Sequence, residues 1–182
     1  LRPTRTVGDL NNDGRVDLAA DSYCIDSACT QRASMVVMGS AALTVNTQQL
    51  TGRNGFVVLN ASRLSAAGNF NGDGFGDLLV QGFGRAMVLY GKMIQGRSVF
   101  PSTVSLGVSG GPPRSPGTTE LRFQSSTAIL REVRGIGDFG GGPEGDLLVT
   151  WCPFGCSFGA ENRARVVFGS PDRPSSLVVD NL

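Results

Sequence analysis

The sequence predicts an all-β fold built from three successive units of four strands each. A loop pattern rich in Asp, Asn and Gly occurs three times, and each copy is followed by a short apolar run and then by a strand-like segment that ends in Gly. The 26 Gly among 182 residues fit turn-rich β structure, and no amphipathic helical pattern is present. We expect one segment over residues 1–182, with units at about 1–60, 61–124 and 125–182.

The loop pattern is clearest in the first two units. Residues 9–17 read Asp-Leu-Asn-Asn-Asp-Gly-Arg-Val-Asp, and residues 69–77 read Asn-Phe-Asn-Gly-Asp-Gly-Phe-Gly-Asp. Both carry oxygen-bearing side chains at loop positions 1, 3, 5 and 9, with Gly at position 6, where a left-handed backbone turns the ligands inward. Such alternation suits a hard cation with six to eight oxygen ligands. The pattern therefore predicts a calcium site in each loop.

Each predicted site uses four side chains and one backbone carbonyl. The expected ligands are Asp9, Asn11, Asp13, Asp17 and the carbonyl of Arg15 in the first loop, and Asn69, Asn71, Asp73, Asp77 and the carbonyl of Phe75 in the second. The first site has three carboxylates and the second has two, so the first should bind calcium more tightly.

The third loop, residues 138–146, has lost most of this pattern. Gly occupies positions 3 and 5, so only Asp138 and Asp146 remain, with Glu144 at position 7 as a further oxygen donor. We expect a weak or lost metal site there, with an empty or water-filled turn.

Two other interpretations of the loops are an ordinary hairpin turn and an EF-hand loop. Asp, Asn and Gly also dominate ordinary hairpin turns, but three ligand positions plus a ninth Asp, repeated along the chain, are poorly explained by turns alone. An EF-hand loop requires a bidentate acid at position 12 and a following helix. Position 12 is Ala20 in the first loop and Val80 in the second, each inside a predicted strand, which excludes the EF-hand.

Strands are predicted around each loop from β-branched and aromatic residues. First strands are expected near Arg5–Gly8, Leu64–Gly68 and Glu132–Gly137, and second strands near Val16–Ala20, Asp77–Gln81 and Asp146–Trp151. Third strands are expected at 34–39, 86–91 and 164–169, and outer strands at 43–46, 102–106 and 175–179. Four antiparallel strands per unit form the blade of a β-propeller.

The chain resembles a known repeat family. Gly-Asp-Leu-Asn-Asn-Asp-Gly-Arg-Val-Asp-Leu at 8–18, combined with Val-Val-Phe-Gly-Ser at 166–170, resembles the FG-GAP (integrin α-subunit-like) repeat. The connecting residues 50–59, which lead into Ala-Ala-Gly-Asn-Phe-Asn-Gly-Asp-Gly, resemble its bacterial secreted type. The resemblance covers essentially the whole chain, although the third loop departs from the pattern. It implies calcium on one rim of a seven-bladed propeller and a role in adhesion or ligand recognition.

Three blades do not close a ring, because propellers typically have four to eight. The chain begins with Leu1 rather than Met and ends in an apolar run at 177–182. We therefore expect a part of a longer chain, or a chain completed by another chain or copy, with 175–179 pairing to a neighbouring edge.

The four Cys form two close pairs, each placed between a predicted second and third strand. They predict the disulfides Cys24–Cys29 and Cys152–Cys156. Disulfides form in oxidising compartments, so we expect a protein that is secreted or at the cell surface. A zinc site is disfavoured because the pairs belong to different units, and a redox pair because neither has two-residue spacing.

Catalysis has little support in the sequence, and we expect no enzyme. The chain has no His and no Gly-x-Ser-x-Gly motif, which leaves only a hydrolase with calcium-activated water. A net charge of +1 without long basic runs does not support nucleic-acid binding, and no apolar stretch is long enough for a membrane span. Of 16 basic residues only Lys92 is Lys; the Arg residues suit acidic ligands or a scattered solvated surface.

Two non-catalytic functions remain. One is an extracellular recognition module for a protein or a glycan, with candidate contact aromatics that alternatively pack between blades: Tyr23, Trp151, Phe154 and Phe158. The other is a structural subunit of a surface or filament assembly, or an accessory propeller of a larger secreted enzyme.

Overall fold

The computed structural model describes residues 4–24, 28, 32–40, 46, 49–82, 84–94, 100–106, 117–122, 128–153, 162–172 and 176–179. This part of the chain is all-β and contains no α-helix. Within the same residues, no helix is long and apolar enough to cross a membrane.

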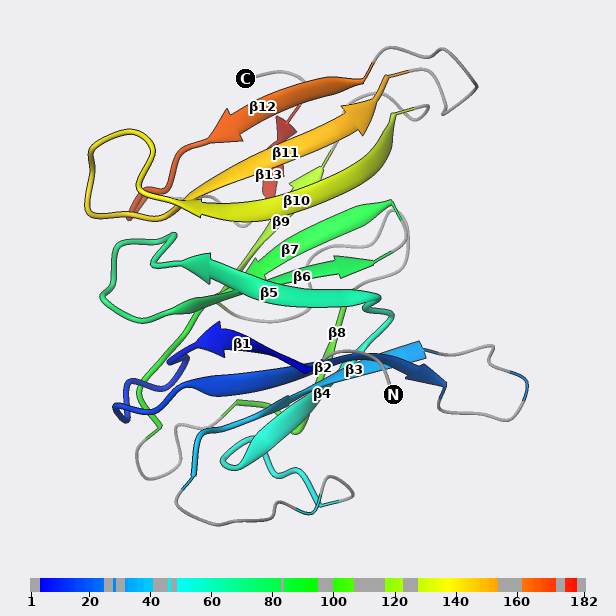
Figure 1. Ribbon diagram of the computed structural model, residues 1–182, viewed down its shortest axis with the longest axis vertical. Helices are drawn as coiled ribbons and strands as arrows, with labels where there is room; N and C mark the ends of the chain where they lie inside the picture. The colour runs from blue at the N-terminus through cyan, green and yellow to red at the C-terminus, as the bar shows by residue number, and fades with distance from the viewer. Residues whose placement is uncertain are drawn as a thin grey trace.

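The described strands form three sheets (Figure 1). The first has the order β1-β2-β3-β4-β8, with β1 Thr4–Gly8, β2 Asp17–Cys24, β3 Arg32–Val37, β4 Gly55–Leu59 and β8 Thr103–Ser105. The second has the order β5-β6-β7-β9-β13, with β5 Arg63–Gly68, β6 Asp77–Gly82, β7 Arg85–Leu89, β9 Thr118–Arg122 and β13 Ser176–Val178. The third has the order β10-β11-β12, with β10 Ile129–Gly137, β11 Asp146–Cys152 and β12 Arg163–Val167.

The predicted first, second and third strands of all three units are confirmed. Each set forms an antiparallel meander, and the acidic loop joins its first two strands. The pairing register shifts at the end of every first strand, at Gly8, Gly68 and Gly137. These glycines have φ of 90°, 77° and 74°, a left-handed conformation that Gly adopts without steric cost. They turn the chain out of the sheet and into the loop.

The predicted outer strands are wrong in their pairing. Residues 102–106 were expected beside the third strand of their own unit, but β8 pairs in parallel with β4 of the preceding sheet. β13 likewise pairs in parallel with β9 of the preceding sheet. It is the edge strand of that sheet, so the expected pairing of 175–179 with another chain stays a prediction. Most of the predicted outer strand 43–46 lies outside the described residues.

The connecting segments supply the fourth strands instead. β4 comes from the segment between the first and second units and pairs with β3, and β9 takes the same place beside β7. Because the connector occupies the edge of the third strand, the following outer strand pairs with the connector. The units are therefore interlocked, because the second and third units each contribute one short strand to the sheet before their own.

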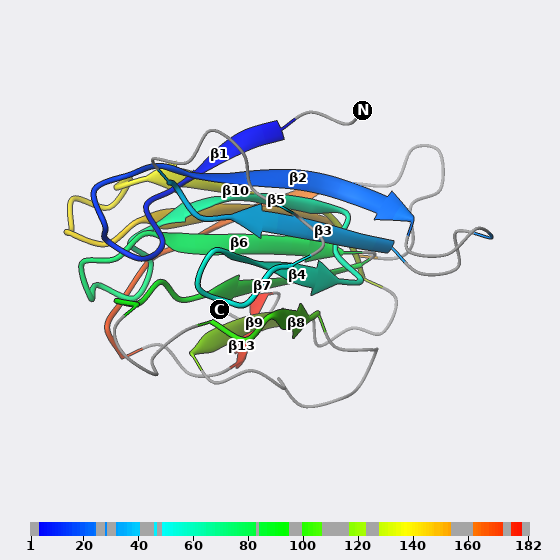
Figure 2. The ribbon, with the colours of Figure 1, turned by 90° about the horizontal axis from the view of Figure 1, so that it is seen from below.

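The three sheets stack face to face (Figure 2), with β1, β5 and β10 toward one side and β8, β9 and β13 toward the opposite side. One hydrophobic core lies between the first and second sheets and another between the second and third. Leu78 belongs to the first core and its neighbour Leu79 to the second. β6 is thus buried on both faces, which explains its continuous apolar run.

Candidate functional site

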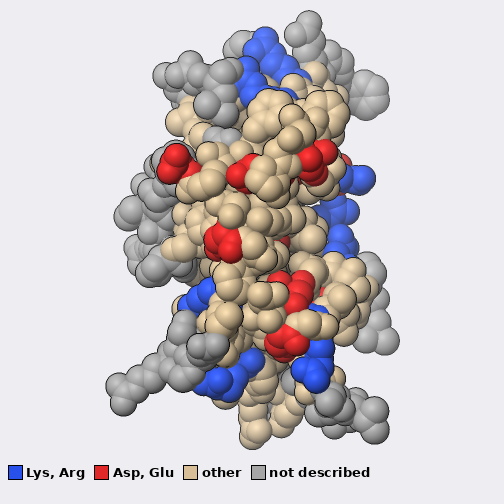
Figure 3. Space-filling view, turned by 90° about the vertical axis from the view of Figure 1, so that its left-hand side faces the viewer, with Lys and Arg blue, Asp and Glu red and all other residues tan. Residues whose placement is uncertain are grey.

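The three acidic loops lie at the same edge of the stack, where each first strand passes into its second strand (Figure 1). Figure 3 faces this edge and shows acidic side chains gathered at successive levels along it. Residues that are 60 or more positions apart in the sequence therefore form one column of loops.

The first loop gathers the side-chain oxygens of positions 1, 3 and 5 around its own backbone. Asp9 Oδ1 and Asn11 Oδ1 both accept from the amide of Asp13, at 3.1 and 3.2 Å. Asp9 Oδ2 accepts from the amide of Gly14 at 2.8 Å, and Asp13 Oδ1 accepts from the amide of Arg15 at 2.9 Å. These are local turn hydrogen bonds of the Asx type, so the loop is ordered by its own polar groups.

The second loop repeats this arrangement. Asn69 Oδ1 accepts from the Gly74 amide at 3.2 Å, and Asp73 Oδ1 accepts from the Phe75 amide at 2.9 Å. Asn71 Nδ2 donates to Asp73 Oδ2 at 2.8 Å, as Asn11 Nδ2 donates to Asp13 Oδ2 at 3.1 Å. The Gly at position 6 has φ of 82° in the first loop and 88° in the second, the left-handed backbone expected there.

The ninth residue of each loop has a structural task that the sequence analysis missed. Asp17 is fully buried, and its Oδ2 accepts from the Leu10 amide at 2.8 Å while its Oδ1 accepts from the Gly39 amide at 2.7 Å. Asp77 does the same with the Phe70 amide at 2.7 Å and the Gly91 amide at 2.9 Å. Each carboxylate thereby ties its loop to the end of the third strand.

Burial changes the acidity of these two carboxyl groups. It raises the pKa of Asp77 to about 6, although hydrogen bonds from the amides of Gly91, Phe70 and Asn71 oppose the rise. The pKa of Asp17 is also raised by burial, against hydrogen bonds from Gly39 and Leu10. A nearby divalent cation would act in the opposite direction, because it favours the ionised form.

The third loop keeps the Asp at positions 1 and 9 and loses the ligands at positions 3 and 5. Asp146 accepts from the amides of Phe139, Gly140 and Gly169. Asp138 Oδ1 accepts from the amide of Gly142 at 3.0 Å. Polar turn contacts thus satisfy both remaining acids, and no described hydrogen bond ties either of them to Glu144.

Among the described residues, no three His, Cys, Asp or Glu side chains form a cluster that could hold a metal ion. In the first two loops the structure brings positions 1, 3 and 5 together, and it engages position 9 with buried amides. Side-chain oxygens at these positions fit the preference of calcium for oxygen ligands. Calcium binding, including the carbonyl ligands at Arg15 and Phe75, stays a prediction.

The cysteines and aromatic candidates are only partly described. Cys24 ends β2; Cys29 lies outside the described residues, so the Cys24–Cys29 disulfide stays a prediction. Cys156 also lies outside them, and the buried Cys152 Sγ donates to Asn162 Oδ1 at 3.3 Å. A Cys152–Cys156 disulfide would replace that hydrogen bond.

Of the aromatic candidates, Tyr23 is partly exposed, and Phe154 and Phe158 lie outside the described residues. Trp151 is buried in the core between the second and third sheets. The packing interpretation is therefore confirmed for Trp151.

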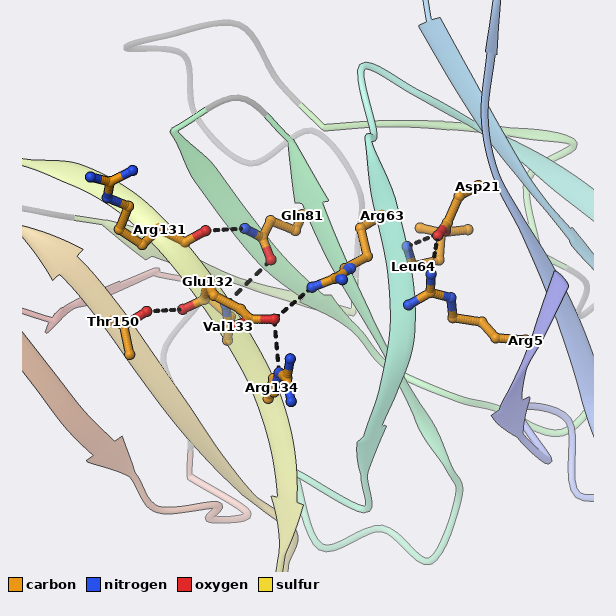
Figure 4. Close-up of polar contacts among 10 residues, drawn as sticks. All are labelled: Arg5, Asp21, Arg63, Leu64, Gln81, Arg131, Glu132, Val133, Arg134 and Thr150. Atoms are coloured by element: carbon orange, nitrogen blue, oxygen red, sulfur yellow. Dashed lines mark hydrogen bonds and ion pairs between the residues drawn. The ribbon is translucent and has the colours of Figure 1, made fainter. Parts of the chain in front are cut away.

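A second polar feature lies along the first strands (Figure 4). Arg5, Arg63 and Arg134, one from each of β1, β5 and β10, line a hollow of about 350 Å³. Arg5 pairs with Asp21, whereas Arg63 and Arg134 both pair with Glu132, at 2.6 and 2.7 Å. The sequence held a signal for this hollow, because Arg5 and Arg134 each stand three residues before the Gly that ends their strand.

Polar side chains on the second strands join neighbouring sheets in the same region. Asp21 Oδ1 accepts from the amide of Leu64 at 2.9 Å. Gln81, at the equivalent place on β6, donates to the carbonyl of Arg131 at 3.0 Å and accepts from the amide of Val133 at 3.2 Å. The first and second repeats thus each hold the first strand of the next repeat through one side chain.

No family model, curated protein or solved structure matches this chain, so the resemblance to the FG-GAP repeat depends on the sequence motifs themselves.

Proposed function

We propose that this chain is an extracellular, non-catalytic recognition or adhesion module whose FG-GAP-like repeats are β-propeller blades stabilised by calcium. One observation carries the proposal: the first two acidic loops occupy equivalent places at one edge of the stack and gather the oxygens of positions 1, 3 and 5 in the same way. Stacked sheets with their first strands on a common side also fit blades around an axis (Figure 2).

Calcium would act on the stability of the loops in this proposal. Asp9, Asn11 and Asp13 would hold it in the first loop, and Asn69, Asn71 and Asp73 in the second. The cation supplies positive charge to loops whose acidic side chains otherwise repel one another. Because these ligands converge only when the loop is folded, binding stabilises the folded state by mass action.

The arginine-lined hollow suggests an acidic ligand for the recognition surface. A guanidinium group binds a carboxylate or a sulfate through two parallel hydrogen bonds. Arg63 is 41% and Arg134 is 65% exposed, so both can reach solvent while they share Glu132. An acidic protein segment or an acidic or sulfated glycan fits this chemistry, and it would compete with Glu132 for the two Arg side chains.

The calcium proposal is tested by the melting temperature of the chain in calcium, in magnesium and in a chelator. Calcium should raise it, and Asp13→Ala should remove most of the increase. The control Asp138→Ala removes the acidic side chain at position 1 of a loop that lacks the ligands of positions 3 and 5, and it should leave the increase intact. Equal losses in the two variants, or no increase with the unaltered chain, would contradict the proposal.

Ligand recognition requires a separate measurement. Binding of the chain to an array of acidic and neutral glycans should favour the acidic members and weaken in the double variant Arg63→Ala, Arg134→Ala. Uniform or absent binding would instead favour the structural-subunit role, which exposed apolar side chains at both ends of the stack support.

A further inference from the structure

Each repeat has two faces, which we call front and rear. The front face packs on the preceding repeat, and the rear face packs on the following one. The second loop residue is a rear-face position: Leu10 is 1% exposed and Phe70 is 0% exposed, because the next repeat covers them. The equivalent residue of the third repeat, Phe139, is 69% exposed. The third repeat thus presents an uncovered rear face.

Other positions show the same contrast. Met38 directly follows β3 and is buried in the core between the first and second sheets. Phe168 has the equivalent place after β12 and is 51% exposed. On the front face, Leu78 and Leu147 are fully buried, while the equivalent Leu18 of the first repeat is 43% exposed. The chain therefore carries one uncovered rear face and one uncovered front face, with apolar side chains on both.

Backbone hydrogen bonds join each rear face to the next front face in a repeated pattern. Between the first two repeats, the amide of Gly76 donates to the carbonyl of Asp9 at 3.2 Å, and the amide of Lys92 donates to the carbonyl of Leu10 at 2.8 Å. Between the second and third repeats, the amide of Gly145 donates to the carbonyl of Asn69 at 2.8 Å, and the amide of Ser170 donates to the carbonyl of Phe70 at 2.9 Å. By repeat equivalence, the acceptors on the uncovered rear face are the carbonyls of Asp138 and Phe139. On the uncovered front face, the amide of Val16 takes the place of the Gly76 and Gly145 donors.

We propose that the rear face of the third repeat binds the front face of the first repeat of a second copy, by the same loop-on-loop contact that joins repeats within the chain. The two surfaces differ, so the association is head-to-tail, and it continues from copy to copy unless the rotation closes a ring. Leu18 would pack into the space that Leu78 and Leu147 occupy in the internal interfaces. The contact uses backbone groups and apolar side chains, and it does not depend on calcium binding.

One residue limits the strength of this contact. The front faces of the second and third repeats have Gly at loop position 8. A Cβ added to Gly76 would lie 2.9 Å from the carbonyl oxygen of Asp9, and a Cβ added to Gly145 would lie 2.8 Å from the carbonyl oxygen of Ala67. The first repeat has Val16 at this position. Its side chain has to be accommodated against the rear face of the next copy, so this contact is weaker than the internal ones.

Sedimentation velocity over a range of chain concentrations tests the proposal with three single variants and one mixture. The unaltered chain should form species that grow with concentration, and Leu18→Lys or Phe139→Lys should each give monomers. An equimolar mixture of the two Lys variants should form a 1:1 dimer and nothing larger, because each variant retains the face that the other lacks. Both side chains are exposed, and circular dichroism melts check that the variants remain folded.

Val16→Gly provides a result in the opposite direction. It should lower the dissociation constant by about tenfold or more, equivalent to about 1.4 kcal/mol. A monomeric unaltered chain whose Val16→Gly variant is also monomeric at high concentration would overturn the proposal. Loss of association in Phe139→Lys but not in Leu18→Lys would also overturn it, since that result indicates a symmetric rear-to-rear dimer.

Discussion

Asp146 Oδ1 accepts a hydrogen bond from the backbone amide of Gly169 at 2.9 Å, in the loop that has lost the predicted metal ligands at positions 3 and 5. The same bond joins Asp17 to Gly39 and Asp77 to Gly91 in the other repeats. A carboxylate that is retained in this bond without its neighbouring ligands has a role in folding that does not require calcium.

Removal of the Asp146 carboxylate should destabilise the protein with or without metal. Asp146→Ala leaves three amides without their acceptor, those of Phe139, Gly140 and Gly169. At about 1–3 kcal/mol for each buried donor that is not resatisfied by water, the free energy of unfolding should fall by about 3 kcal/mol. Urea denaturation in a chelator measures it. Asp73→Ala removes an exposed side chain and should lower the free energy of unfolding by less than half as much. Equal losses in the two variants would argue against a structural role for the Asp146 carboxylate.

The charge of the second loop should set its calcium affinity. Asn69→Asp adds a third carboxylate and gives this loop the acid count of the first, so calcium should bind about tenfold more tightly, an effect of about 1.4 kcal/mol. Asp73→Asn should change the affinity in the opposite direction. Titration calorimetry on the two variants provides the test, and a change of the same sign in both would exclude charge as the determinant.

The stability of the contact between β5 and β10 should depend on pH through Glu132. Hydrogen bonding by Arg134, followed by that of Arg63, lowers the pKa of Glu132 from its usual 4.5. The stabilisation is therefore fully present above about pH 4.5 and is lost as the pH falls through the lower folded-state value.

The measurement compares melting temperatures of the unaltered chain and Glu132→Gln between pH 3 and 6. The unaltered chain should be the more stable at pH 6, and the difference should shrink toward pH 3. A pH-independent difference would show that the ion pairs do not contribute. Asp77, whose pKa is raised to about 6, is common to both proteins, so its opposite pH dependence cancels in the comparison.

Close approach of backbone atoms from its own repeat and from the preceding repeat should make Gly91 intolerant of any side chain. A Cβ there would lie 2.1 Å from the carbonyl oxygen of Gly76 and 2.9 Å from that of Leu10, so backbone would have to move. Gly91→Ala should cost about 3 kcal/mol of stability. The control Gly142→Ala would meet only the flexible end of Glu144, at 2.8 Å, and should be nearly neutral by thermal denaturation.

The strands around the loops were predictable because the evidence for them is local. A loop with Gly at position 6 and an apolar run after position 9 determines where β1 ends and β2 begins. The pairing of Thr103–Ser105 was not predictable, since a three-residue strand carries no mark of its partner. Its place was decided by the connector strand β4, which occupies the edge of β3 first.

The candidate site was likewise predictable from the sequence only in part. The oxygen-bearing side chains at loop positions 1, 3 and 5 were found from their spacing. That spacing could not show that Asp17 and Asp77 face backbone amides from the far end of the meander, because Gly39 and Gly91 come close only after the sheet has formed. The arginine-lined hollow was missed for a similar reason, since its residues come from three different sheets.

The strand that each repeat lends to the preceding sheet sets an order for folding. The first sheet cannot close its outer edge until Thr103–Ser105 has left the ribosome, and the second must wait for Ser176–Val178 near the end of the chain. Such non-local pairing slows folding and leaves strand edges exposed to misassembly during synthesis. A nascent chain that stalls after the second repeat would therefore display an unfinished middle sheet, which a chaperone would have to shield.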